Sequence, residues 1–231
     1  MKDIAIYTLT SELHDAEAVG NMTNDFLASL HTEYDLKGDN YADYGTHTLD
    51  LIFVRTGGTE GIFKRLLPQL QALSGKPVYL LTSGKSNSLA ASMEILSYLR
   101  QNNLKGEIIH GSAEYIQRRI NLLANAGRAL KQMDGSRLGI VGKPSDWLIS
   151  SSFDREKVRQ HLGIHLKDID MQELLDAIST LPTNDKTEEA APSEAIGKAL
   201  PGALRIYEGL KQIVARHQLQ GFTIRCFDLL T

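Results

Sequence analysis

Short apolar runs alternate with longer stretches of helical periodicity through the first half of the chain. The runs predict four strands, at residues 4–9, 51–55, 78–81 and 107–110. Helices are predicted after Gly58 and from about residue 112 to 133. Such alternation is typical of βαβ units, in which right-handed crossovers join parallel strands. The pattern therefore predicts an open, doubly wound sheet.

A crossover helix is predicted between the third and fourth strands, from about residue 86 to residue 102 or 103. Leu89, Met93, Leu96 and Leu99 recur at spacings of 4, 3 and 3 residues, which places them on one stripe of a helix. We expect this stripe to face the core. Glu94 lies one residue from the stripe and is expected to be solvated.

A turn signal at Asp134-Gly135-Ser136 divides the pattern into two parts. We expect an N-terminal α/β domain at residues 1–134 and a second α/β domain at residues 135–231. The polar segment 182–192 lacks any period and is expected to form a mobile surface loop. The second domain is predicted to contain strands at 138–141, 164–169 and 222–227, and helices at 154–161, 171–180 and 194–217.

The sheet of the second domain is thin for its length. Residues 221–227 are expected to form a buried strand, and the chain stops four residues later, at Thr231. The sequence therefore predicts an α/β protein with two Rossmann-like parallel-sheet domains, of which the second is smaller and incomplete.

Length and composition exclude several classes of protein. The 231 residues suffice for one large domain or two small ones. The apolar share is about 47% when the 19 glycines are counted and the 8 tyrosines are left out, which excludes disordered and fibrous chains. No apolar run approaches the ~18 residues of a membrane span, and the N-terminus lacks the apolar core of a signal peptide. The lone cysteine, Cys226, has no partner for an intrachain disulfide, so a cytoplasmic location is expected.

Charge is balanced along the chain. The 25 basic and 28 acidic residues give a net charge of -3 and divide evenly between the two halves. Such a balance gives no net positive electrostatic potential that would attract a polyanion. Neither nucleic acid nor an anionic membrane is therefore an expected partner.

The loop after the third predicted strand has the sequence Thr82-Ser83-Gly84-Lys85-Ser86. It resembles the tail of a P-loop, but that motif requires glycine at position 79, where Tyr79 stands. Nucleotide hydrolysis is therefore excluded. Two interpretations remain: a glycine turn with a Ser N-cap, or a loop whose N–H groups, with Asn87 and Ser88, face a polar ligand.

The segment from Arg55 to Gly61 has the same position after the second strand. Its glycines do not have the G-x-G-x-x-G spacing, so the dinucleotide fingerprint is absent. A plain turn with a Thr cap and a ligand-facing loop are both open interpretations.

The only tryptophan lies in Gly142-Lys143-Pro144-Ser145-Asp146-Trp147-Leu148, after the first strand of the second half. A tryptophan beside Ser, Asp and Lys in a strand-end loop suits a sugar, because the indole packs on C–H groups while its neighbours bind hydroxyls. The alternative is an aromatic side chain packed at a domain junction.

The remaining residues do not indicate a metal site or a Ser-His-Asp catalytic triad. His161 and His165 are four residues apart, but Gly163 interrupts the helix between them and the glutamate of a zincin is missing. No Cys/His set has zinc spacing. Asp228 follows the final predicted strand and is the best-placed carboxylate, without a visible partner.

Three strings occur in one order along the chain: residues 87–95 (NSLAASMEI), 142–148 (GKPSDWL) and 223–229 (TIRCFDL). Together they resemble the L-fucose isomerase and L-arabinose isomerase family. The resemblance extends over essentially the whole chain, yet it matches only the N-terminal, two-domain portion of such enzymes.

The resemblance implies aldose–ketose isomerisation. In this family a divalent cation, usually manganese, holds two oxygens of the sugar, and two carboxylates move a proton between C1 and C2 through an enediol. The family's metal ligands lie downstream of the strand that resembles residues 222–227. This chain is therefore expected to bind no metal and to catalyse no turnover by itself.

The same resemblance implies a scaffold with part of a sugar pocket, in a homo-oligomer that is a trimer or a hexamer. No catalytic residue is assigned to this chain. The residues expected to face the sugar are Asn87, Ser88, Ser145, Asp146, Trp147 and Arg225.

Two other classes of protein compete with an isomerase. One is a non-catalytic sugar-binding or regulatory α/β module. The other is a flavodoxin-like or response-regulator-like domain, but Tyr7-Thr8-Leu9-Thr10 stands where a response regulator would carry acidic residues.

Overall fold

The structure is a computed structural model that describes residues 2–182 and 193–229. The chain divides into two compact units, Met1–Lys131 and Gln132–Thr231. The boundary expected at residues 134 and 135 lies in the same short stretch of chain. The polar segment predicted to be a mobile loop lies, apart from Pro182, outside the described residues.

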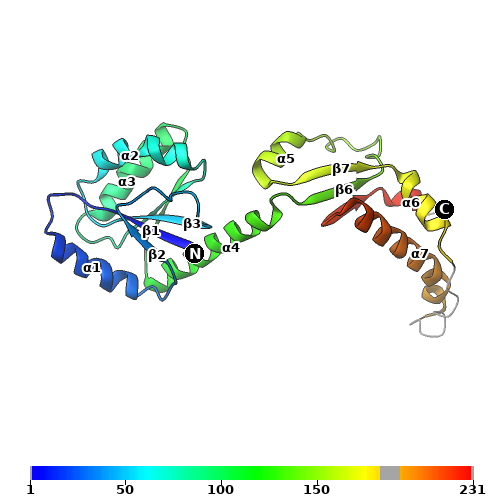
Figure 1. Cartoon of the computed structure of the whole chain (residues 1–231), viewed down its shortest axis with the longest axis horizontal. Coiled ribbons are helices and arrows are strands. Elements are labelled where there is room, and N and C mark those ends of the chain that lie inside the picture. Colours follow the sequence, from blue (N-terminus) through cyan, green and yellow to red (C-terminus); the bar gives the residue numbers. More distant parts are fainter. Residues whose placement is uncertain (1, 183–192, 230–231) are drawn as a thin grey trace. The chain divides into compact units, whose positions relative to one another are not determined.

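Unit 1 contains a five-stranded sheet in which every pairing is parallel, with the strand order β2-β1-β3-β4-β5. The predicted α/β class is confirmed, and all four predicted strands are present. The elements of unit 1, shown in Figure 1, are β1 (Ile4–Leu9), α1 (Ala16–Ala28), β2 (Asp35–Gly38), β3 (Leu49–Val54), α2 (Glu60–Leu73), β4 (Val78–Leu81), α3 (Ser88–Gln101), β5 (Gly106–Ile109) and α4 (Ala113–Met133).

Helices cover both faces of this sheet (Figure 1). On one face, Tyr7 and Ile52 pack with Phe63 of α2 and Ile95 of α3. On the other face, strand residues such as Leu51 pack with residues of α1 and α4. Successive side chains of a strand point to opposite faces, so a strand buried on both faces needs apolar side chains at most positions. Strands β1 and β3 are apolar except for the buried Thr8 and Asp50.

Two elements of unit 1 are absent from the prediction, α1 and β2. Helix α1 begins after the N-cap Asp15, whose side chain accepts a hydrogen bond from the N–H of Ala18 at 2.8 Å. Its buried residues, Val19, Thr23 and Leu27, include a threonine, which weakens the apolar pattern. Strand β2 is a polar edge strand of four residues and gives no apolar signal.

The stripe predicted to face the core from α3 is partly wrong. Met93 is 60% exposed, while the buried residues are Ser88, Ala91, Ser92, Ile95 and Leu99. The small side chains let the helix approach the sheet closely, and they rotate the buried face away from Met93. Glu94 is exposed, as expected.

Unit 2 contains a smaller, three-stranded parallel sheet with the order β7-β6-β8. Val141 and Ile169 of this sheet pack against α6 and α7, through residues such as Leu174 and Ile213. The elements of unit 2 (Figure 1) are β6 (Arg137–Val141), α5 (Arg155–Leu162), β7 (His165–Ile169), α6 (Met171–Ser179), α7 (Glu194–His217), β8 (Gly221–Ile224) and the 3-10 helix η2 (Cys226–Leu229).

The prediction of a buried strand over residues 221–227 is wrong. Strand β8 ends at Ile224, and η2 follows it. None of the four residues of β8 is buried, and Phe222 is 40% exposed. The reason is position, because β8 is an edge strand of a sheet that has a buried apolar cluster on one face.

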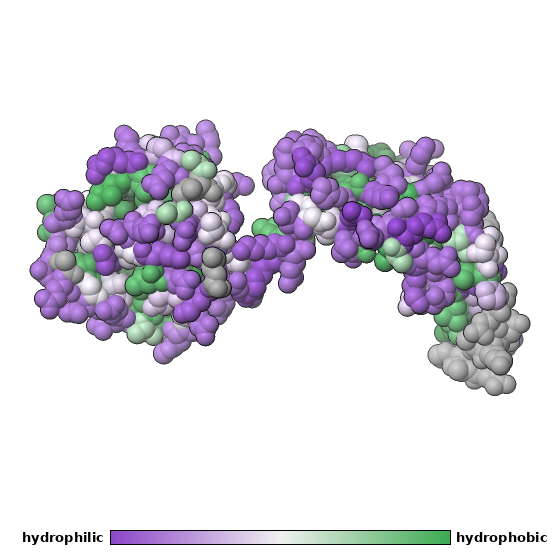
Figure 2. All heavy atoms as spheres, viewed as in Figure 1, coloured by the Kyte–Doolittle hydropathy of each residue, from purple (hydrophilic) through white to green (hydrophobic). Residues whose placement is uncertain are grey.

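His161 and His165 are separated as expected. Helix α5 ends at Leu162 with Gly163 in the left-handed conformation (φ 68°), and His165 begins β7. In Figure 2 both units have a largely hydrophilic surface with small hydrophobic patches. No helix in the described ranges is long and apolar enough to cross a membrane.

Candidate functional site

The candidate site lies at the carboxyl edge of the unit 2 sheet, where the ends of three parallel strands meet. Backbone hydrogen bonds continue the ladder one residue beyond the strands: the N–H of Gly142 donates to the carbonyl of Ile169 at 2.9 Å, and the N–H of Arg225 donates to that of Val141 at 3.0 Å. The loops that leave β6, β7 and β8 are thereby held side by side. Open α/β sheets bind ligands at this edge.

Gly142 makes this convergence possible. Its φ of +82° is one that L side chains rarely adopt. A Cβ at this position would lie 3.0 Å from Cε of Met171 and 3.1 Å from Cβ of Arg225. Glycine therefore lets the β6 loop turn between the ends of β7 and β8.

Two adjoining cavities open at this edge, with volumes of about 760 and 440 Å³. Both fall in the range of ~300–1,000 Å³ that is usual for small-molecule sites. The larger is lined by charged and hydroxyl side chains together with apolar ones, and the smaller mainly by apolar ones. Ile140, Lys143, Ser151, Phe153 and Arg225 line both.

The apolar part of the lining comes from the sheet itself. Leu138, Ile140 and Leu166 are partly exposed and point away from α6 and α7. The crossover helix on the way to β7, α5, has no buried residue. This face of the sheet therefore forms an accessible apolar floor beside polar walls.

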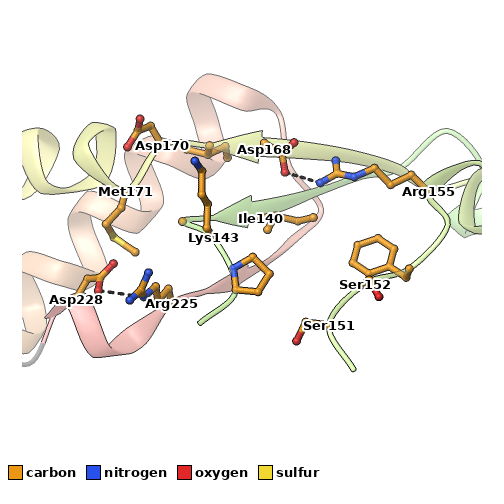
Figure 3. A pocket seen from close by; sticks show the side chains of 14 residues that line it. Ile140, Lys143, Ser151, Ser152, Arg155, Asp168, Asp170, Met171, Arg225 and Asp228 are labelled. Carbon is orange, nitrogen blue, oxygen red and sulfur yellow. Dashed lines mark hydrogen bonds and ion pairs between the residues drawn. The ribbon is translucent and has the colours of Figure 1, made fainter. Parts of the chain in front are cut away.

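Two ion pairs stand in the polar walls, as Figure 3 shows. Arg155 Nη2 lies 2.7 Å from Asp168 Oδ1, and Arg225 Nε lies 3.2 Å from Asp228 Oδ1. In that view Lys143 lies between the two pairs. Asp228, for which the sequence indicates no partner, is thus paired with Arg225.

A third carboxylate is held by a helix. Asp170 caps α6, and its side chain accepts a hydrogen bond from the N–H of Gln172 at 3.0 Å. Across the cavity, the guanidinium of Arg155 lies 5.9 Å from the ring centroid of Phe153. The site therefore offers cationic donors, carboxylate acceptors and an aromatic side chain to one ligand.

The predicted ligand residues of unit 2 divide into two groups. Ser145 and Arg225 line the smaller cavity, and Ser145 is buried. Asp146 and Trp147 do not line it; Trp147 is 64% exposed and stands edge-on to Phe227, with 5.8 Å between ring centroids. Because Phe227 lines the cavity, Trp147 lies within one side chain of it.

The other two predicted ligand residues belong to the loop before α3 in unit 1. Asn87 is exposed, in the left-handed conformation (φ 58°), and its side chain makes no capping hydrogen bond. Ser88 is fully buried, and its hydroxyl accepts a hydrogen bond from that of Thr82 at 2.7 Å. Ser88 therefore stabilises the loop from inside. The expected Ser N-cap is wrong, because Asn87 holds the N-cap position.

Arg155, Asp168 and Asp170 are site residues that the sequence analysis did not single out. Asp168 and Asp170 flank the end of β7, and the rule that ligands gather at strand ends would have indicated them. Arg155 opens α5, away from any strand end, so only the tertiary structure brings it to the cavity.

Comparison of the chain with protein-family models and with curated proteins gives no match.

Proposed function

We propose that the chain forms the two N-terminal α/β units of a sugar isomerase that resembles L-fucose and L-arabinose isomerases. Unit 2 binds the aldose or ketose at the carboxyl edge of its sheet. The observation that carries the proposal is the mixed lining of the larger cavity, where cations, carboxylates and hydroxyls surround one volume of about 760 Å³.

A sugar suits this lining for a chemical reason. Each sugar hydroxyl both donates and accepts hydrogen bonds, so a polyol needs donors and acceptors at close intervals. Arg155 and Lys143 donate, while Asp168 and Asp170 accept. The C–H face of a sugar also packs on apolar surface, which Ile140 and Phe153 supply.

The manganese ion of the family does not fit the donor set of this cavity. Asp168 and Asp228 are each paired with an arginine, and Asp170 caps a helix. Lys143 adds a further positive charge to the lining. The proposed role of this chain is therefore binding and orientation of the sugar.

Sugar titration of the intrinsic fluorescence of Trp147 tests the proposal. We expect a saturable change with an aldose or its ketose, because Trp147 contacts Phe227 at the cavity wall. A Trp147→Phe variant controls for signal from the sugar itself. No response to any pentose, hexose or deoxyhexose, with no binding heat by calorimetry, would contradict the proposal.

A matched pair of arginines on α5 locates the binding. Arg155→Gln removes a charged donor from the cavity, and we expect the affinity to fall about tenfold or more. Arg159→Gln, one turn further on, breaks only an exposed pair with Glu156 and is expected to leave the affinity unchanged. Equal losses in both variants would place the sugar elsewhere.

The non-catalytic alternative, a sugar-binding module, is favoured by the same pairing of carboxylates with arginines. An isomerase assay of this chain with added manganese tests it. We expect binding without turnover, and clear turnover would show that the chain assembles a metal site of its own.

A further inference from the structure

Unit 1 has a topological switch point between β1 and β3. In the order β2-β1-β3-β4-β5 the chain passes from β1 to β2 on one side of β1, and it then returns to form β3 on the other side of β1. The helices after β1 and β3, α1 and α2, lie on opposite faces of the sheet. The loops after these strands therefore diverge, and a crevice opens between them at the carboxyl edge.

A cavity of about 400 Å³ lies at this point, separate from those of unit 2. Its polar lining comes from β1, α1, the end of β2 and the residue after β3. The side chains that bear on its chemistry are Thr8, Thr10, Thr23, Asn24, Asp39 and Arg55.

Arg55 is held in place by neutral hydroxyls. Its Nε donates to Oγ1 of Thr10 at 2.6 Å, and its Nη1 donates to Oγ1 of Thr23 at 3.4 Å. Thr23 is 4% exposed and donates its own proton to the carbonyl of Val19 at 2.7 Å, so it serves as a fixed acceptor for the guanidinium.

Arg55 is a charge without an ion pair. Within the described part of the chain no carboxylate lies within 4 Å of its guanidinium. Burial lowers the pKa of Arg55, and Asp39 partly offsets that effect. Of its five N–H groups, two are used by threonines, which leaves three for a ligand.

We propose that this cavity binds a small phosphate ester that also carries a hydroxyl group. The phosphate lies on Arg55, whose fork of N–H groups matches its oxygens, and the Thr10 hydroxyl donates a further hydrogen bond. The Asp39 carboxylate accepts from the ligand's hydroxyl and repels its phosphate, so it fixes the direction of binding. The cavity volume of about 400 Å³ is many times the ~30 Å³ that a water molecule occupies in the liquid. A bare phosphate, with its five heavy atoms, would leave much of this volume unfilled, so the cavity has room for an ester.

Calorimetric titration of the full chain with glycerol 3-phosphate, at low ionic strength, tests this site. Glycerol and inorganic phosphate are the comparison ligands. We expect glycerol 3-phosphate to bind most tightly, inorganic phosphate more weakly, and glycerol without measurable heat. Binding of inorganic phosphate alone would overturn the assignment to an ester.

Variants of Arg55 and Asp39, which are expected to change the phosphate affinity in opposite directions, locate the bound anion. Arg55→Gln is expected to weaken both phosphate ligands about tenfold or more, whereas Arg65→Gln, which removes an exposed charge from α2, leaves them unchanged. Asp39→Asn is expected to strengthen inorganic phosphate, because it removes a repelling carboxylate. Equal effects of Arg55→Gln and Arg65→Gln would overturn the proposal, since they would indicate a response to net charge.

Arg55→Lys and Asp39→Asn keep the test decisive if Arg55→Gln fails to fold. Lysine retains the charge and loses the planar fork, so we expect an intermediate affinity for the ester. An unchanged affinity in both variants would also overturn the proposal.

Discussion

The sheet of unit 1 is buried on both faces, whereas only one face of the unit 2 sheet packs in a buried apolar cluster. Two apolar clusters flank the five strands of unit 1, and a single cluster lies beneath the three strands of unit 2. In unit 2 the uncovered face supplies the floor of the proposed sugar cavity. The proposed site in unit 2 therefore depends on this open face, because a helix packed there would fill the space that the ligand needs.

The two units also differ in how their sites are charged. At the switch point of unit 1 one arginine is held by hydroxyls, while the unit 2 cavity has paired charges of both signs. We therefore expect an anion in the first and a neutral polyol in the second.

A matched isoleucine in the central part of each sheet gives the largest contrast in stability. Ile52 of β3 is fully buried, and Ile140 of β6 is partly exposed at the open face. Ile52→Ala is expected to cost about 2–5 kcal/mol of unit 1 stability, and Ile140→Ala about 1 kcal/mol of unit 2 stability. Native-state hydrogen exchange of strand amides measures each unit separately. Equal costs would show that the unit 2 sheet is as well covered as that of unit 1.

Two glycines within helices, one in each unit, differ in how closely their surroundings pack. A Cβ at Gly127 of α4 would lie 2.6 Å from the carbonyl oxygen of Thr48, whereas a Cβ at Gly202 of α7 meets nothing within 4 Å. Gly127→Ala is therefore expected to destabilise unit 1 by about 1–3 kcal/mol. Gly202→Ala is expected to stabilise unit 2 by about 0.5–1 kcal/mol through helix propensity. Thermal unfolding of both variants checks the signs, and a gain from Gly127→Ala would contradict the close helix–sheet contact.

The pH dependence of stability is expected to differ in sign between two buried or half-buried carboxylates. Burial raises the pKa of Asp50, which accepts hydrogen bonds from Tyr7 and His47. The native state then binds the proton more tightly than the unfolded state, so ionised Asp50 costs stability as the pH rises through its raised pKa. Asp50→Asn is expected to gain stability relative to the native chain as the pH rises from 4 to 7.

Glu173 of unit 2 provides the opposite case. The Arg216 guanidinium, followed by His217, lowers the pKa of this carboxyl. Its stabilising effect is present above the ordinary glutamate pKa of about 4.3 and is lost as the pH falls through the lowered value. Glu173→Gln is therefore expected to destabilise unit 2 at neutral pH and to have little effect in acid. Urea unfolding curves at several pH values measure the free energy of unfolding of Asp50→Asn and Glu173→Gln relative to the native chain. If this difference changes with pH in the same direction for both variants, the assignment is contradicted.

The apolar runs were sufficient to predict most strands, and they failed where packing depends on position in the sheet. Strands buried on both faces, such as β1 and β4, are apolar at nearly every position, and the sequence predicts both. The polar edge strand β2 has no such run. An apolar run at residues 221–227 indicated burial, but no sequence pattern shows that β8 lies at an edge and ends after four residues.

The candidate site could be predicted only in part. The loop after β6 was singled out because it follows a strand, and the structure places Ser145 in the lining. The pairing of Arg155 with Asp168 depends on α5 and β7 meeting in space. Such a contact between residues 13 positions apart has no signature in the order of residues.

Residue-resolved NMR titration with a monosaccharide tests the sugar site most directly. We predict that the backbone amide signals that shift belong to the carboxyl edge of the unit 2 sheet: Gly142, Lys143, Ser151, Asp170 and Arg225. Shifts that fall instead around Thr10 and Arg55 in unit 1, or no shifts at saturating sugar, would contradict the assignment of the sugar to unit 2.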